Sequence, residues 1–311
     1  MIAPPANLAR RLWVYQAERF PVFKHAALIA AFSSCGICLS TLLRHDVQWP
    51  APKAFVVAFV VVFGLFLQLR IADEHKDAEV DARYRPGRPV PRGLVSLQTL
   101  RNLALGVAVV QAAACLWLSP LLLGLLAIVW LYFALMSAEF FVPAWLKARP
   151  VVYLLSHMAI MPLIDIWVSA CDWLPNGGRP PAGLGWFLGL SFFNGLVLEI
   201  GRKTWPPEME QPGVDSYSRA WGVKPALGAW MAALGLALAC SVVQASRFIV
   251  APITAGLLVL VLAIAGFVIS RFYRAPRRRD AAALENLSGV WVLLCYLGLG
   301  LVPLGLELCR S

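Results

Sequence analysis

Charge is scarce in this sequence. Only 14% of its 311 residues are Asp, Glu, Lys or Arg, whereas 60% are hydrophobic and the mean hydropathy is +0.71. A soluble domain carries about 25% charged residues, so this shortage excludes an ordinary soluble chain and indicates a polytopic membrane protein. The N-terminal segment also lacks a small-residue cleavage site behind an apolar core, so we expect no removable signal peptide.

Cysteine spacing of the metal-binding kind is also nearly absent. The chain has seven cysteines, mostly inside apolar runs, and a metal-type spacing occurs only as Cys35-x-x-Cys38. That pair lies within SSCGICLS, where small residues favour close packing of membrane helices. The pattern therefore argues against redox or cysteine–metal chemistry.

Long apolar runs dominate what is present. A membrane helix needs about 20 predominantly apolar residues. Nine runs meet this criterion: 23–43, 51–72, 97–117, 120–141, 150–172, 183–203, 225–245, 249–270 and 286–306. The sequence thus predicts an all-α membrane protein with about nine transmembrane helices in a single domain, 1–311.

The positive charges fix the predicted orientation. With the N-terminus and every second loop on one side, that side holds 22 of the 27 Lys and Arg residues. This asymmetry places the N-terminus in the cytoplasm and the C-terminus on the opposite side. The net charge of +10 then reflects orientation and contact with membrane lipids, so no nucleic-acid partner is expected.

Three aspartates stand at the cytoplasmic end of the second predicted span. Asp73, Asp77 and Asp81 are four residues apart, so a continuous helix would place all three on one face. Like charges at this spacing repel one another. A divalent cation that bridges them to an anionic ligand would relieve the repulsion, and oxygen-rich sites suit Mg²⁺. We therefore predict a Mg²⁺ site here.

Arginines follow these aspartates at once. Four occur in the next stretch: Arg83, Arg85, Arg88 and Arg92. Guanidinium groups bind phosphate oxygens bidentately, so carboxylates beside arginines suit a diphosphate site, in which we include Arg88 and Arg92. The alternative is a solvated loop with ion pairs on the helix surface.

The same residues carry a family resemblance. The run Asp73-Glu-His-Lys-Asp77-Ala-Glu-Val-Asp81, followed by Arg88-Pro-Val-Pro-Arg-Gly93, resembles the UbiA superfamily of intramembrane prenyltransferases. That family's first signature is N/D-x-x-x-D-x-x-x-D followed by R-P-[LIV]-P-x-G. Asp73 replaces the commoner Asn, and the gap before Arg88 is about two residues shorter than usual. The resemblance implies a helical bundle around a central cavity and Mg²⁺-dependent ionisation of an isoprenyl diphosphate.

The family's second signature, D-x-x-x-D, is altered. Glu199 occupies its first position, but Lys203 stands four residues later. Three further acids follow in the loop: Glu208, Glu210 and Asp215. One of them could complete a second metal site with Glu199, or Lys203 could bind phosphate directly as a point charge. We favour Glu199 as a metal ligand and Lys203 as a phosphate contact.

Other polar residues lie at or near membrane depth, where ionisable groups are costly and by default functional. Two roles are predicted for Asp165. It either contacts the acceptor or accepts its proton, or it forms a structural hydrogen bond between helices. Glu199 is a second candidate proton acceptor. His157 is interpreted as a packed histidine. The resemblance also implies a Tyr and a Lys near the end of the fourth span for phosphate contact, for which Tyr132 and Lys147 are candidates.

These observations predict a membrane-embedded, Mg²⁺-dependent prenyltransferase. It would move an isoprenyl group from an isoprenyl diphosphate to an aromatic or lipid acceptor, in a bacterial inner membrane, with loops 73–96 and 204–224 capping the active site. The alternatives are a UbiA-type terpene cyclase or a phosphoribosyl transferase that uses the same diphosphate site. A metal or solute permease is the alternative of another class, but no convincing internal repeat is found and the acids cluster at one membrane face.

Overall fold

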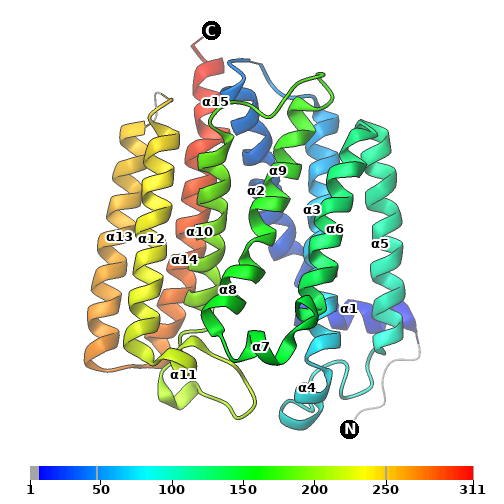
Figure 1. Ribbon diagram of the computed structural model, residues 1–311, viewed down its shortest axis with the longest axis vertical. Coiled ribbons are helices and arrows are strands. Elements are labelled where there is room, and N and C mark those ends of the chain that lie inside the picture. The colour runs from blue at the N-terminus through cyan, green and yellow to red at the C-terminus, as the bar shows by residue number, and fades with distance from the viewer. Residues whose placement is uncertain (1–6, 47, 249–250, 311) are drawn as a thin grey trace.

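The chain folds into a bundle of helices that run roughly side by side (Figure 1). The computed structural model describes residues 7–46, 48–248 and 251–310. The long helices are α2 (Val22–Leu43), α3 (Pro52–Lys76), α5 (Leu97–Leu118), α6 (Leu121–Ser137), α8 (Pro150–Met158) with α9 (Ile160–Trp173), α10 (Leu184–Arg202), α12 (Val223–Ala245), α13 (Ala251–Arg274), and α14 (Arg278–Leu299) with α15 (Leu301–Leu308).

Short helices gather at one end of the bundle. These are α1 (Leu8–Arg19), α4 (Ala78–Tyr84), α7 (Pro143–Lys147) and α11 (Tyr217–Trp221), which lie at the lower end in Figure 1, while α15 ends at the upper one. Two short 3₁₀ turns, η1 (Glu139–Phe141) and η2 (Pro207–Met209), complete the described elements.

The described residues contain eight candidate membrane spans and one shorter apolar helix, roughly consistent with the nine spans predicted. Eight helices, counting α8–α9 and α14–α15 as one each, are long and apolar enough to cross a membrane, and α6 is a shorter apolar helix. The prediction placed most ends within a few residues, although α3 and α13 run four residues further than predicted, α6 ends four residues earlier and α14 begins eight residues earlier. The predicted start of the eighth span at residue 249 lies outside the described residues.

The spans close into a ring. Packing contacts run from α2 through α3, α5, α6, α9, α10, α12, α13 and α14, and α14 contacts α2 again. Contacts of α2 with α9 and of α10 with α14 cross the ring. Two apolar cores result, one centred on α10, α12 and α14 and the other on α2, α3 and α9.

Buried tryptophans tie neighbouring helices together. Trp167 on α9 donates its indole N–H to the Leu122 carbonyl at 3.0 Å, and Trp230 on α12 donates to the Val197 carbonyl at 3.1 Å. Trp291 on α14 donates to the Asn194 side chain of α10 at 3.1 Å. A buried indole N–H needs such a partner, so these bonds set the relative height of adjacent helices.

The chain passes from α6 to α7 through an unusual turn. Three consecutive non-glycine residues, Glu139, Phe140 and Phe141, have positive φ angles of 47°, 51° and 61°. The left-handed region is unfavourable for residues with a Cβ atom, so the surrounding contacts must hold this turn. It explains why the predicted fourth span stops short of residue 141.

Candidate active site

Both charged loops lie at the same end of the bundle, beside α4 and α11 (Figure 1). They also contact each other. Gly213, in the second loop, has φ +73° and lies so close to the Tyr84 ring of α4 that a Cβ atom there would clash with it. Glycine is therefore required at this position both for its backbone angle and for the contact between the loops.

The first predicted motif sits where α3 ends. Asp73 lies in the last turn of α3, and its side chain is 58% exposed, with Arg70 at 3.8 Å as its nearest cation. The helix is interrupted at Asp77, which caps α3, and α4 begins at the next residue. The expectation of one continuous helical face is thus corrected: the aspartates follow one another across a break, and their surroundings differ.

Asp81 is drawn into the protein. Its side chain is 2% exposed and pairs with Arg85 at 3.4 Å and with Arg88 at 2.5 Å. A buried carboxylate needs such partners, and the two arginines supply them. Arg92 lies on the surface and binds Glu18 of α1 through two nitrogens, at 2.6 and 2.9 Å.

The altered second motif lies opposite the first one. Glu199, in the last turn of α10, is 16% exposed and pairs with Arg202 at 2.6 Å and with Lys203 at 2.9 Å. Arg202 and Lys203 also interact electrostatically with Asp73 of α3. The ends of α3 and α10 therefore face each other with opposite charges, as the proposed pairing of the two motifs requires.

The later acids of the second loop have other partners. Glu210 accepts hydrogen bonds from the Ser216 and Ser218 hydroxyls at 2.6 and 2.7 Å, and Glu208 accepts one from the Arg278 backbone N–H at 3.1 Å. Burial raises the pKa of Tyr217, which lies after this loop, so its hydroxyl stays protonated at neutral pH. For Asp215, the structure gives no ion pair or side-chain hydrogen bond.

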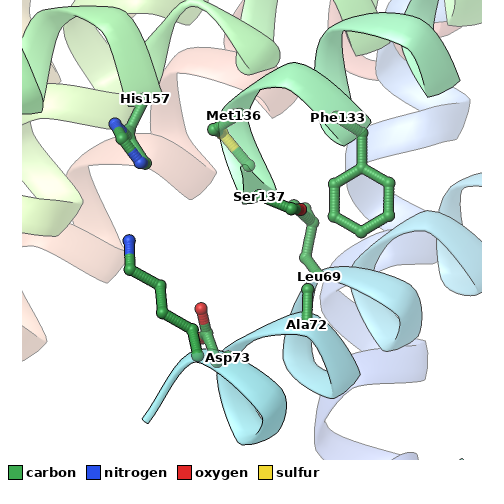
Figure 2. A pocket seen from close by; sticks show the side chains of 8 residues that line it. Leu69, Ala72, Asp73, Phe133, Met136, Ser137 and His157 are labelled. Carbon is green, nitrogen blue, oxygen red and sulfur yellow. The ribbon is translucent and has the colours of Figure 1, made fainter. Parts of the chain in front are cut away.

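A small cavity of about 40 Å³ opens beside the first motif. It is lined by α3, α6 and α8 through Leu69, Ala72, Asp73, Lys76, Phe133, Met136, Ser137 and His157. Figure 2 shows Asp73 and His157 directed toward the same opening from different helices. The cavity joins an acid, a cation and an imidazole to apolar walls.

Lys76 is a site residue that the sequence analysis missed. Its ammonium group lies 2.7 Å from Glu139 and contacts the Tyr153 hydroxyl, and the Tyr153 ring centroid lies 4.7 Å away. Lys147, the predicted phosphate contact, is 62% exposed and lies 3.9 Å from Glu139. The available signal was the position of Lys76 within the aspartate motif, one turn after Asp73.

Asp165 lies apart from this cavity. It is fully buried on α9 and accepts a hydrogen bond from the Tyr296 hydroxyl of α14 at 2.5 Å. Asp165 therefore forms an interhelical hydrogen bond, which is one of the two roles predicted for it. Its catalytic role stays a prediction, and Tyr132, whose hydroxyl binds the Ser156 carbonyl at 2.6 Å, likewise remains untested as a phosphate contact.

The fit to a divalent cation rests on the donor types. In the part of the chain that the structure describes, no three Asp, Glu, His or Cys side chains converge on one point. The carboxylates of Asp73 and Asp77 offer oxygen ligands; among the described residues, Arg70 lies 3.8 Å from Asp73 and no ion pair is formed by Asp77. This arrangement suits Mg²⁺, which usually binds one or two carboxylates and completes its shell with substrate phosphates and water.

Fold and site together define a polytopic α-helical membrane protein with a charged mouth at one end of the bundle. The UbiA prenyltransferase family model matches residues 36–294. The chain therefore belongs to the UbiA prenyltransferase family, as its first aspartate motif indicated.

Individual relatives agree with this assignment. The digeranylgeranylglyceryl phosphate synthase of Methanopyrus kandleri is 31% identical over 175 residues, which make up 55% of this chain and 57% of that protein. A solved structure from work on digeranylgeranylglyceryl phosphate synthase in membranes superposes with a TM-score of 0.62 and 17% identity, covering 95% of this chain and 99% of the other. The apo structure of a UbiA homologue from Aeropyrum pernix K1 gives 0.66 and 15%, covering 88% and 96%. The two structures support the fold.

Proposed function

We propose that this protein transfers an isoprenyl group from an isoprenyl diphosphate to a hydrophobic acceptor, with Mg²⁺ as cofactor. The observation that carries the proposal is the meeting of the two motifs. Asp73 at the end of α3 faces Arg202 and Lys203 at the end of α10, with the cavity beside it. Membership of this family also favours an enzyme over the permease.

The proposed roles follow the charge of each side chain: acids for Mg²⁺ and cations for phosphate. Asp73 and Asp77 would hold Mg²⁺, which when bound neutralises negative charge on the leaving diphosphate. Lys203 and Lys76 offer ammonium groups to the phosphate oxygens, and Glu199 keeps Lys203 in place at 2.9 Å. Asp81 serves the same site through Arg88, which it positions at 2.5 Å. Arg92 and Lys147 lie further out and would assist capture of the substrate by their charge.

The acceptor class follows from the setting. The cavity lies beside the first motif, and Leu69, Phe133 and Met136 form part of its wall. An acceptor would therefore approach from this apolar side. The similarity to a protein named digeranylgeranylglyceryl phosphate synthase favours a lipid acceptor over an aromatic one. We propose a prenylated glyceryl phosphate as the first acceptor to test.

The test is a product assay on the purified protein in lipid nanodiscs. It supplies geranylgeranyl diphosphate with Mg²⁺ or EDTA, and with geranylgeranylglyceryl phosphate, a hydroxybenzoate or no acceptor. We expect Mg²⁺-dependent release of diphosphate and a prenylated product that appears only with an acceptor. Diphosphate and a cyclic hydrocarbon without an acceptor would show the cyclase instead, and no diphosphate release from geranyl, farnesyl or geranylgeranyl diphosphate would refute the proposal.

A further inference from the structure

His157 has one ring nitrogen in use and one free. Its ring stacks on the Tyr153 ring, with centroids 3.9 Å apart and planes 11° apart, as expected of a packed histidine. Nδ1 lies 2.8 Å from the Tyr153 carbonyl oxygen. Nε2, by contrast, is buried and has no hydrogen-bond partner among the described residues.

The Tyr153 carbonyl fixes the tautomer. A carbonyl oxygen can only accept, so Nδ1 must carry the hydrogen and donate it. In the uncharged imidazole Nε2 then carries a lone pair. Since His157 lines the cavity together with Asp73 and Lys76, a basic nitrogen stands beside the place proposed for the leaving diphosphate.

The other predicted proton acceptors are less suited to this position. Asp165 does not line the cavity and is bonded to Tyr296. Glu199 is held by two cations at 2.6 and 2.9 Å, which stabilise its charged form and weaken it as a base. Asp73 is the proposed metal ligand.

We propose that Nε2 of His157 accepts the proton that the acceptor loses during prenyl transfer, an inference that rests on the function proposed above. The C1–O bond of the isoprenyl diphosphate breaks, and its electron pair leaves with the diphosphate. The acceptor atom forms a bond to C1, its bond to hydrogen breaks, and the proton passes to Nε2 and later to water.

The surrounding charges support this step. The charged groups that interact with His157 are Lys76 of α3, Glu139 of η1 and Glu199 of α10. The diphosphate released beside His157 stabilises the imidazolium that forms.

The test uses two variants, His157→Asn and His157→Gln. Asparagine keeps a donor for the Tyr153 carbonyl but has no group at Nε2, and glutamine fills the space of the ring without a basic nitrogen. The assay measures diphosphate release and prenylated product separately, with geranylgeranyl diphosphate and either geranylgeranylglyceryl phosphate or a hydroxybenzoate. We expect product formation to fall about 10²-fold, the usual contribution of a general base.

Diphosphate release should fall far less, because ionisation does not need the base. The variants should therefore release diphosphate in excess over product, as water captures the cation, whereas wild type yields both in equal amounts. His75→Asn is the matched control. His75 makes the same bond to the carbonyl four residues earlier, from Nδ1 to Ile71 at 2.9 Å, but is exposed and does not line the cavity.

Three outcomes would overturn the inference. Product formation within about threefold of wild type in both variants would show that no proton passes to His157. An equal loss of diphosphate release and product, with a lower melting temperature, would show a merely structural role. Wild type that transfers to neither acceptor would instead refute the proposed function and this inference with it.

Discussion

The two ends of the helical bundle use the same residue types in opposite ways. At the end away from the motifs, Arg44 of α2 donates to both carboxylate oxygens of Asp172 on α9, at 3.0 and 3.1 Å, and the Ser40 hydroxyl donates to one of them at 2.7 Å. At the motif end, Asp73 is 58% exposed, and its nearest cation is 3.8 Å away. One end is closed by its ion pair, and the other leaves carboxylate oxygens available for a ligand.

The largest expected effect tests the open end. Asp73→Asn and Asp77→Asn should each lower kcat by about 10³-fold, because each removes a carboxylate charge from the proposed Mg²⁺ site and metal charge stabilisation is worth several kcal/mol. The melting temperature should stay close to that of wild type, since neither side chain has a close ion pair within the protein. Product formation and thermal unfolding of the same preparation would check both parts.

Glu79→Gln is the control for these variants. Glu79 is an exposed acid of α4 between Asp77 and Asp81, so the substitution removes a nearby charge without touching the proposed ligands. Its activity should match wild type. An equal loss in all three variants would mean that only the overall negative charge of the loop matters.

The next effect tests the closed end. Arg44→Ala leaves Asp172, 3% exposed, without its cation, and should lower the free energy of unfolding by about 3 kcal/mol. Chemical unfolding in detergent micelles would measure it, and kcat should be unchanged because the site lies at the other end. Arg179→Ala, at an exposed arginine of the same end, should have almost no effect.

The smallest effect separates the two lysines at the motif end. Lys76→Met should lower kcat/KM about tenfold, as expected for loss of a hydrogen bond to a charged phosphate, whereas Lys147→Met should change it by less than about twofold. Steady-state kinetics with varied isoprenyl diphosphate would show the difference. Adding Glu139→Gln to Lys76→Met removes the unpaired acid, so a loss that persists belongs to the substrate and not to stability.

The fold could be predicted from the sequence because membrane spans are marked by runs of apolar residues and by the distribution of charged residues between them. Nine apolar runs and the distribution of Lys and Arg predicted the spans, and the aspartate motif predicted the family that the comparison shows. Local pattern could not show the burial of Asp81, since its short contact with Arg88 depends on how the chain turns after α4. The short helix α1 was not predicted for a similar reason. Its Arg19 pairs with Glu74 of α3 at 2.5 Å, a contact between residues far apart in the sequence.

The site was less accessible than the fold. Asp73 and Glu199 were selected as members of two separate motifs, and their position on opposite sides of the mouth depends on the closing of the helical ring. His157 was interpreted as a packed residue. That interpretation fits Nδ1, which contacts the Tyr153 carbonyl, but it does not account for the unpartnered Nε2 among the described residues. Lys76 escaped notice because a lysine beside aspartates is usually a surface ion pair.

The left-handed turn of Glu139, Phe140 and Phe141 carries a consequence for the evolution of the chain. Glycine would adopt these angles with little strain, whereas each residue with a Cβ costs about 1 to 2 kcal/mol there. Selection for stability alone would favour glycine at such positions. Since this turn carries side chains at all three positions, contacts such as that of Glu139 with Lys76 at 2.7 Å must offset its strain.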